Sequence, residues 1–157
     1  MKVLVAVDGS LYSEAAVSEV SSRQWPESTE IKVVTAFEIP MMPTPEVWVL
    51  QSEDYDQMEK IVRERAEATV NSAASKLAGS LGASITVTKE ILPGSPKIVI
   101  VEKTDQWQAD LIVVGSHGYG PWHRFLLGSV SQVVVSHAHC SVEVVRSRKH
   151  DEAVKAA

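Results

Sequence analysis

The segment from residue 109 to 130, ADLIVVGSHGYGPWHRFLLGSV, constrains the fold more than any other part of the sequence. It opens with an apolar run at residues 111–114, which is long enough for one buried strand and too short for a helix. The run ends at Gly115, and a further glycine, Gly118, follows within one turn. Since glycines allow tight turns and close approach of the backbone, the segment is predicted to pass from a buried strand into a glycine loop.

The second half of this segment predicts a helix start. Gly128-Ser129 follows Gly118 after nine intervening residues, and valines with helical spacing begin at Val130. Ser129 with Gln132 three residues later matches a capping box, so Ser129 is predicted to cap this helix. A glycine loop provides exposed backbone N–H groups, and a helix N-terminus adds partial positive charge. Together they predict a phosphate-binding cradle.

The distribution of acidic residues favours the same ligand class. The chain carries 20 Asp and Glu among 157 residues, yet none lies between Asp110 and Glu143. Strands and packed helices account for part of this gap, because they lack acids in any case. The loop from residue 116 to 127 is not expected to be core, so its lack of carboxylates indicates a site for a polyanion.

The remaining periodicity predicts a single α/β domain over residues 1–146, followed by a polar tail at 147–157. Strands are predicted at 3–7, 31–37, 84–91, 111–114 and 142–145, and helices at 10–24, 53–81, from 96 and from 129. Residues 98–101 prefer a strand by propensity, but Ser95-Pro96 is a helix-start pattern and the next strand requires a crossover. The alternating residues 84–91 indicate a half-exposed edge strand. The alternation of strands and helices predicts five mainly parallel strands with helices on both faces.

A proline-rich segment separates the second strand from the longest helix. Residues 38–51 contain three prolines together with Met41, Met42 and Trp48, so regular structure is excluded although the segment is apolar. Two interpretations remain open: a flap that packs on its own domain or a partner, and a lid over a bound base.

These motifs resemble those of the universal stress protein family. The pattern Gly115-x-x-Gly118, nine residues, Gly128-Ser129 is similar to the ATP-binding signature of that family. The resemblance covers nearly the whole chain, and the other segments that carry it are VLVAVDGS at 3–10, Gly94-Ser95-Pro96, and HAHC at 137–140 with the strand at 142–145. It implies a doubly wound open sheet with strand order 3-2-1-4-5. Ligands then bind where the order reverses, between the first and fourth strands.

The resemblance also implies roles for individual residues. The residues expected to bind the phosphates of ATP are Gly115, Gly118, Gly128, Ser129 and Val130. Asp8 is expected to face the ribose and a Mg²⁺ ion held by the nucleotide, and Phe37 is expected to contact the adenine.

Three of the candidate side chains keep alternative interpretations. Asp8 could equally cap the following helix through an Asx turn. His117 either hydrogen-bonds a phosphate or points to solvent. Arg124 lies in the arm between the glycines, where its planar guanidinium could reach a γ-phosphate. The arm carries Pro121-Trp122 where the family is rich in glycine.

Three functions are compatible with this pattern. The leading one is an ATP-binding regulator of the stress response that acts by binding or switching; its partners would be an adenine nucleotide, an unknown protein and a second copy of the chain. The resemblance implies that such a homodimer pairs through Val142, Val144 and Val145. A slow ATP hydrolase or autophosphorylating enzyme, and a dimerisation module with a vestigial pocket, are the alternatives. A dedicated enzyme is disfavoured because the chain lacks a P-loop lysine and a base beside the γ-phosphate.

The net charge, the cysteine count and the N-terminal sequence limit the partners and the cellular compartment that are expected for this protein. The net charge of −5 gives no global attraction to nucleic acid or to an anionic membrane. The single Cys140 cannot form an internal disulfide, and the five-residue apolar run at 3–7 is too short for a signal sequence. A cytoplasmic protein is therefore expected.

Overall fold

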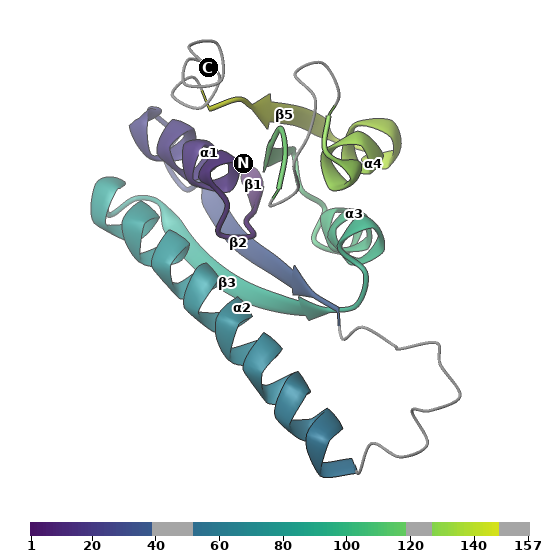
Figure 1. Cartoon of the computed structure of the whole chain (residues 1–157). Helices are drawn as coiled ribbons and strands as arrows, with labels where there is room; N and C mark the ends of the chain where they lie inside the picture. Colours follow the sequence, from purple (N-terminus) through teal and green to yellow (C-terminus); the bar gives the residue numbers. More distant parts are fainter. Residues whose placement is uncertain (39–51, 119–126, 148–157) are drawn as a thin grey trace, which may run out of the picture.

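The computed structural model describes residues 1–38, 52–118 and 127–147, and these form one five-stranded parallel sheet with helices on both faces (Figure 1). The elements in chain order are β1 (Lys2–Ala6), α1 (Leu11–Ser22), β2 (Glu30–Phe37), α2 (Ser52–Ser80), β3 (Thr86–Pro93), α3 (Pro96–Gln106), β4 (Leu111–Gly115), α4 (Ser129–His137) and β5 (Ser141–Val145). The sheet order is β3-β2-β1-β4-β5, and all four strand pairs are parallel. The predicted fold class and strand order are confirmed.

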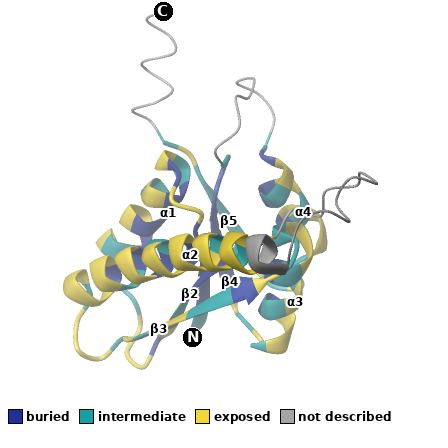
Figure 2. Cartoon of the chain, turned by 60° about the horizontal axis from the view of Figure 1, so that its bottom comes forward, coloured by how far each residue is buried: buried dark blue, intermediate teal, exposed yellow. Residues whose placement is uncertain are grey.

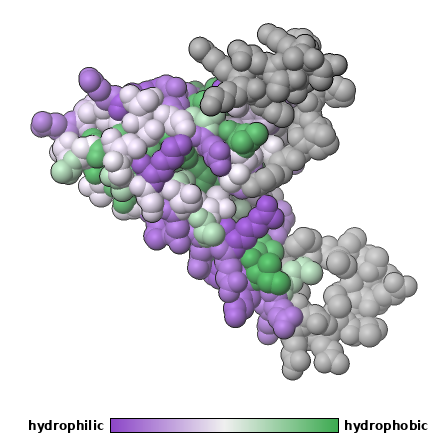
Figure 3. All heavy atoms as spheres, turned by 60° about the vertical axis from the view of Figure 1, so that its left-hand side comes forward, coloured by the Kyte–Doolittle hydropathy of each residue, from purple (hydrophilic) through white to green (hydrophobic). Residues whose placement is uncertain are grey.

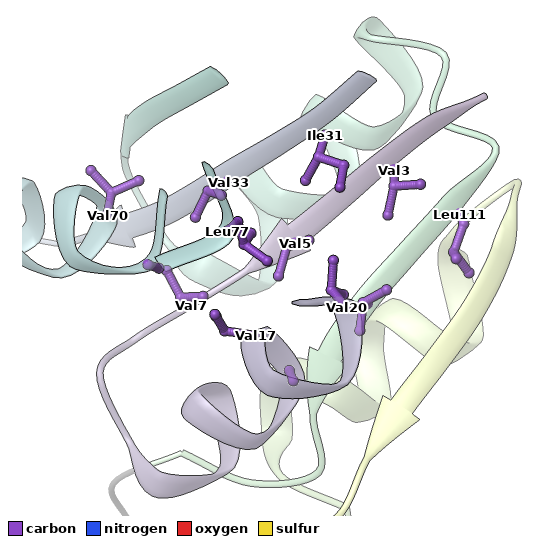
Figure 4. Close-up of a cluster of buried hydrophobic side chains, with 13 residues drawn as sticks. Val3, Val5, Val7, Val17, Val20, Ile31, Val33, Val70, Leu77 and Leu111 are labelled. Carbon is purple, nitrogen blue, oxygen red and sulfur yellow. The ribbon is translucent and has the colours of Figure 1, made fainter. Parts of the chain in front are cut away.

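The two faces of the sheet bury separate hydrophobic layers. Along β1, Val3 and Val5 face α1 and α2, whereas Leu4 and Ala6 face α3 and α4. This alternation follows from the two-residue period of a strand. Figure 4 shows the first layer, and Figure 2 shows the buried strands between helices whose outer faces are exposed. Each fully buried aliphatic side chain stabilises the fold by about 1.5–3 kcal/mol relative to its exposed state.

The turn from β1 into α1 is tightly hydrogen-bonded. Ser10 caps α1 as predicted: its side chain accepts a hydrogen bond from Ser13 N at 3.3 Å. In return Ser13 Oγ donates to Ser10 O and accepts from Gly9 N, at 3.0 and 3.1 Å. Gly9 has φ of 84°, a conformation that glycine adopts without strain. These bonds fix the backbone that carries Asp8.

The start of β3 and the helical state of residues 98–101 can both be compared with the prediction. β3 begins at Thr86, two residues later than predicted, because its ladder with β2 starts where Thr86 pairs with Glu30. β3 is an edge strand, as predicted. Residues 98–101 are helical, as predicted against their strand propensity: Pro96 occupies the first turn, and Ile100 and Thr104 are buried one turn apart. Burial on the sheet therefore outweighs local propensity here.

α2 extends well beyond the sheet that it covers. Its C-terminal half contributes the buried residues Val70, Ala73 and Leu77. Nearer its start, Met58 and Ile61 are exposed, and Figure 3 shows this end of the molecule as hydrophilic apart from one apolar patch. Although α2 has 29 residues, none of the helices in the described ranges is long and apolar enough to cross a membrane. The predicted proline-rich segment beyond residue 38 and the tail beyond residue 147 lie outside the described residues.

A charged cluster fixes the β3 edge to its neighbours. Glu90 on β3 contacts Lys32 of β2 at 3.0 Å and Lys103 of α3 at 2.5 Å. Partial burial of the carboxyl group opposes ionisation, but the hydrogen bonds from Lys103 and Lys32 outweigh it, so the pKa of Glu90 is lowered. A carboxyl group with a lowered pKa stabilises the folded state above its unfolded pKa. That contribution is lost as the pH falls through the folded pKa.

We therefore expect Glu90→Gln to lower the free energy of unfolding by about 1 kcal/mol at pH 7 and by nothing near pH 2. Urea denaturation of both proteins between these pH values measures the difference. Glu102→Gln, a change at an exposed position of α3, is the control and should have little effect. A difference for Glu90→Gln that stays constant from pH 7 to pH 2 would contradict the ion-pair explanation.

Candidate functional site

A cleft opens at the carboxyl ends of the two central strands, β1 and β4. Its volume is about 180 Å³. Seven of the nine predicted binding residues line it: Asp8, Gly115, His117, Gly118, Gly128, Ser129 and Val130. β1 and β4 are neighbours in the sheet although they lie far apart in sequence, which is why the two loops meet. The predicted convergence of the two glycine-containing loops is confirmed.

One oxygen of the Asp8 carboxylate is bound within the protein, and the residue lines the cleft. Its Oδ1 accepts a hydrogen bond from Ser10 N at 2.9 Å, so the Asx-turn interpretation is correct. Oδ2 lies beside Gly118, where a methyl group added to that glycine would be only 2.7 Å away. Within the described ranges, no hydrogen bond reaches Oδ2. The carboxylate is thus held by one oxygen and offers the other to the cleft.

Gly115 has a structural role that the sequence did not reveal. A Cβ at this position would lie 2.7–2.9 Å from the backbone of Tyr12 and Ser13 in the first turn of α1. The Gly115 carbonyl also accepts a hydrogen bond from Ser131 Oγ at 2.6 Å. At Gly115, β4 therefore contacts both α1 and α4, and a side chain would push α1 away.

The start of α4 differs from the predicted capping box. Gly128, not Ser129, is the N-cap, and no side chain caps the helix. The reason is a close contact: a Cβ on Gly128 would lie 3.0 Å from His117 Cα, and Gly128 N donates to Ser116 O at 2.8 Å. The amide of Gly128 is therefore already engaged within the protein.

Ser129 is instead the first helical residue, and the helical ladder begins with Gln132 N donating to Gly128 O. The N–H groups at the first positions of a helix have no intrahelical acceptor. At α4 these belong to Ser129, Val130 and Ser131, all of which line the cleft. Among the described residues no backbone acceptor pairs with these donors, and the start of α4 presents them to the cleft together with the positive end of its dipole.

One of the two interpretations predicted for His117 was a side chain that points to solvent. The structure does not show this orientation. The residue is half-buried, its Nδ1 lies 3.1 Å from Ser116 Oγ, and its ring lies 5.0 Å from that of Tyr12. Its Nε2 is buried and has no hydrogen-bond partner among the described residues.

Phe37, one of the predicted binding residues, does not line the cleft. Phe37 is 6% exposed, and its ring lies 5.2 Å from the guanidinium of Arg63 on α2. Because side chains alternate along a strand, Ala36 is the β2 residue that reaches the cleft. Arg124 lies outside the described residues.

The apolar wall of the cleft was missed by motif reading. Its residues are Ala6, Ala36, Pro96, Ile100 and Val114. They come from three strands and α3, and each belongs to an element that was assigned correctly. The signal that could have found them is the alternation on β1 and β2, which places even-numbered residues on the α3 side. The lining therefore combines apolar side chains with hydrogen-bonding groups, a combination suited to a ligand with a flat apolar part and an anionic part.

The whole chain matches known proteins. The model of the universal stress protein family matches residues 1–146. A universal stress protein of Mycobacterium tuberculosis, Rv2005c, is 35% identical over 97% of this chain, which spans about half (49%) of the relative's length.

Two solved structures with nucleotides share the fold. A universal stress protein family protein from Arabidopsis thaliana with AMP bound has a TM-score of 0.66 and 20% identity, covering 96% of this chain and 94% of its own. A universal stress protein in complex with cAMP has a TM-score of 0.61 and 25% identity, covering 92% and 96%. The match of the family model over residues 1–146 shows that the chain belongs to the universal stress protein family.

Proposed function

We propose that this protein binds an adenine nucleotide, ATP with Mg²⁺, in the cleft between β1 and β4. The observation that carries the proposal is the pair of N–H groups at Ser129 and Val130, which have no acceptor within α4 and belong to residues that line the same cleft as Gly118. Backbone donors at a helix N-terminus bind phosphate without a basic side chain. The AMP and cAMP complexes of related proteins support the same ligand class.

In this proposal the adenine base and the Mg²⁺ ion contact different residues of the cleft. The apolar wall formed by Ala36, Ile100 and Val114 accommodates the adenine, in place of the contact first expected from Phe37. Asp8 Oδ2 accepts a hydrogen bond from the ribose or coordinates Mg²⁺. No group of three His, Cys, Asp or Glu side chains gathers in the described part of the chain. Most ligands of the cation would therefore come from the phosphates and water.

The role that follows is regulation by nucleotide-dependent binding, in the cytoplasm, and not rapid turnover. Phosphoryl transfer requires a positioned nucleophile as well as charge neutralisation. Near the described cleft, Asp8 is the one acid among the lining residues, and one of its oxygens is occupied by Ser10 N. Gly118 and Ser129 are both retained, which disfavours a vestigial pocket.

Calorimetric titration with ATP, ADP and AMP in the presence of magnesium tests this function. We expect a dissociation constant in the micromolar range, equivalent to about −8 kcal/mol. Phosphate release should stay far below the roughly 1–100 s⁻¹ of dedicated kinases. Asp8→Ala serves as the control for a contaminating ATPase. Absence of binding by all three nucleotides would refute the proposal, and turnover near one per second that Asp8→Ala abolishes would make the protein an ATPase.

We also propose that the protein forms a homodimer through β5. The backbone of β5 shows which groups are available: Ser141 N donates to Asp110 O, and Val145 O accepts from Ser116 N, both on the β4 side. Since successive residues of a strand direct their backbone groups to opposite sides, Val142 and Val144 present theirs to the open edge. Arg23 holds the strand in place through two hydrogen bonds to Glu143, at 2.8 and 2.9 Å.

Val144→Pro is expected to shift the protein from dimer to monomer, because it removes an N–H donor at the open edge and leaves the bonds to β4 intact. Sedimentation velocity at roughly 50 µM, a concentration that favours even a micromolar dimer, measures the change. Val144→Thr keeps the N–H group and the β-branched shape and should remain dimeric. A wild-type protein that sediments as a monomer would refute the dimer.

A further inference from the structure

One buried polar atom belongs to a residue that lines the cleft, His117. His117 Nε2 is inaccessible to solvent, and none of the described residues gives it a hydrogen-bond partner. Leaving such an atom unpaired is unfavourable, so native structures contain few of them. The imidazole is nevertheless held firmly, by Ser116 at Nδ1 and by the ring of Tyr12. A fixed ring with an unsatisfied nitrogen indicates a partner that the described residues do not supply.

The neighbouring serine determines what kind of partner this nitrogen needs. Ser116 is 1% exposed, and within the described residues its hydroxyl has one hydrogen-bond partner, His117 Nδ1. A buried hydroxyl proton requires an acceptor, so Ser116 donates and Nδ1 accepts. In the neutral imidazole the ring proton then resides on Nε2. His117 Nε2–H is therefore a donor, and its missing partner is an acceptor.

The backbone of Ser116 makes this arrangement rigid. Its N–H donates to Val145 O at 2.7 Å, and its carbonyl accepts from Gly128 N at 2.8 Å. The same contact brings His117 Cα against Gly128, the residue that caps α4. His117 thus lies beside the N-terminus of α4, whose first N–H groups have no acceptor within the helix.

We propose that Ser116 is a positioning residue that fixes the tautomer of His117, so that Nε2–H donates a hydrogen bond to a phosphate oxygen of the nucleotide. The inference rests on the proposed function and assigns one donor within that site. A phosphate oxygen is the appropriate acceptor because the start of α4 supplies further donors at the same end of the cleft. With its proton on Nε2, this nitrogen has no lone pair for a metal ion, so the cation remains on the Asp8 side.

The tautomer is tested first on the free full-length protein. Long-range proton–nitrogen correlation spectra of the ¹⁵N-labelled imidazoles distinguish a proton on Nε2 from one on Nδ1. We expect the Nε2–H form for His117 in the wild type at pH 8, and a mixture of the two tautomers in Ser116→Ala. A wild-type His117 with its proton on Nδ1 would overturn the inference, and so would a Ser116→Ala spectrum identical to that of the wild type.

The ligand contact is tested by comparing AMP with adenosine, which lacks the phosphate. Ser116→Ala should weaken AMP binding about tenfold and leave adenosine binding unchanged. His117→Gln retains an N–H donor that does not depend on Ser116. Adding Ser116→Ala to His117→Gln should therefore cause no further loss. Equal losses for AMP and adenosine, or a full Ser116→Ala effect in the His117→Gln background, would overturn the proposal.

The two proposals fail in different ways. If the wild type binds neither AMP nor ATP, the proposed function is wrong. The proposed phosphate contact is then refuted as well, whichever tautomer of His117 is observed. If the wild type binds AMP and Ser116→Ala binds it equally well, the nucleotide site stands and the role of Ser116 and His117 is refuted. Denaturation of each variant confirms that the folded state is retained in both cases.

Discussion

Gly115→Ala is expected to destabilise the protein by about 3 kcal/mol, one of the largest effects of any single methyl group in this chain. The added Cβ would lie 2.7 Å from the carbonyl carbon of Tyr12 and 2.9 Å from Ser13 N. These are backbone atoms in the first turn of α1, so no side-chain rotation relieves the contact. α1 must move away from β4, and the packing of Val17 and Val20 against the sheet is disturbed with it.

Thermal and urea denaturation measure this effect, which corresponds to a fall in melting temperature of roughly 10 °C for a domain of this size. Gly79→Ala is the matched control, because no atom lies within 4 Å of its added methyl group. Gly79 is in the last turns of α2, where alanine is favoured over glycine by about 1 kcal/mol. The two substitutions should therefore have opposite signs. A Gly115→Ala protein as stable as the wild type would show that α1 does not approach β4 this closely.

The fold was predictable because its signals are strong and local. The runs at 111–114 and 3–6 are apolar on both faces, which is typical of central parallel strands, whereas β3 at the edge is mostly polar and half-exposed. α3 was the hardest element, since Ile98 and Val99 favour a strand. The Ser95-Pro96 start and the need for a crossover gave the correct result.

The site was predictable only in part, because its details depend on contacts between segments distant in sequence. Ser129 matched a capping box, yet Gly128 caps α4 because it must lie against Ser116 and His117. No local pattern contains that contact. Phe37 was assigned to the cleft although its neighbour Ala36 occupies that face, an error of one residue in strand phase. Arg124 remains a prediction, since it lies outside the described residues.

Substitution of Gly118 is expected to have the opposite effect to substitution of Gly115. It should abolish nucleotide binding and leave the stability of the fold nearly unchanged. A Cβ on Gly118 would approach one group within 3 Å, Asp8 Oδ2 at 2.7 Å. This atom is the end of a side chain on an exposed residue, so it can move at little cost to stability. The backbone of Gly118 is also not in the left-handed region, so a side chain introduces no strain.

Gly118→Val should weaken ATP binding by at least about 100-fold, equivalent to roughly 3 kcal/mol, while the free energy of unfolding changes by less than about 1 kcal/mol. The valine fills the space between Asp8 and the start of α4, where the phosphates are proposed to lie, and it displaces the carboxylate that faces them. Calorimetric titration and urea denaturation of the same preparations give both quantities. Gly82→Val, at a position with no atom within 4 Å, is the control and should bind ATP as the wild type does. Equal affinities of the wild type and Gly118→Val would exclude this cleft as the nucleotide site. Loss of binding together with loss of stability would mean that Gly118, like Gly115, serves packing.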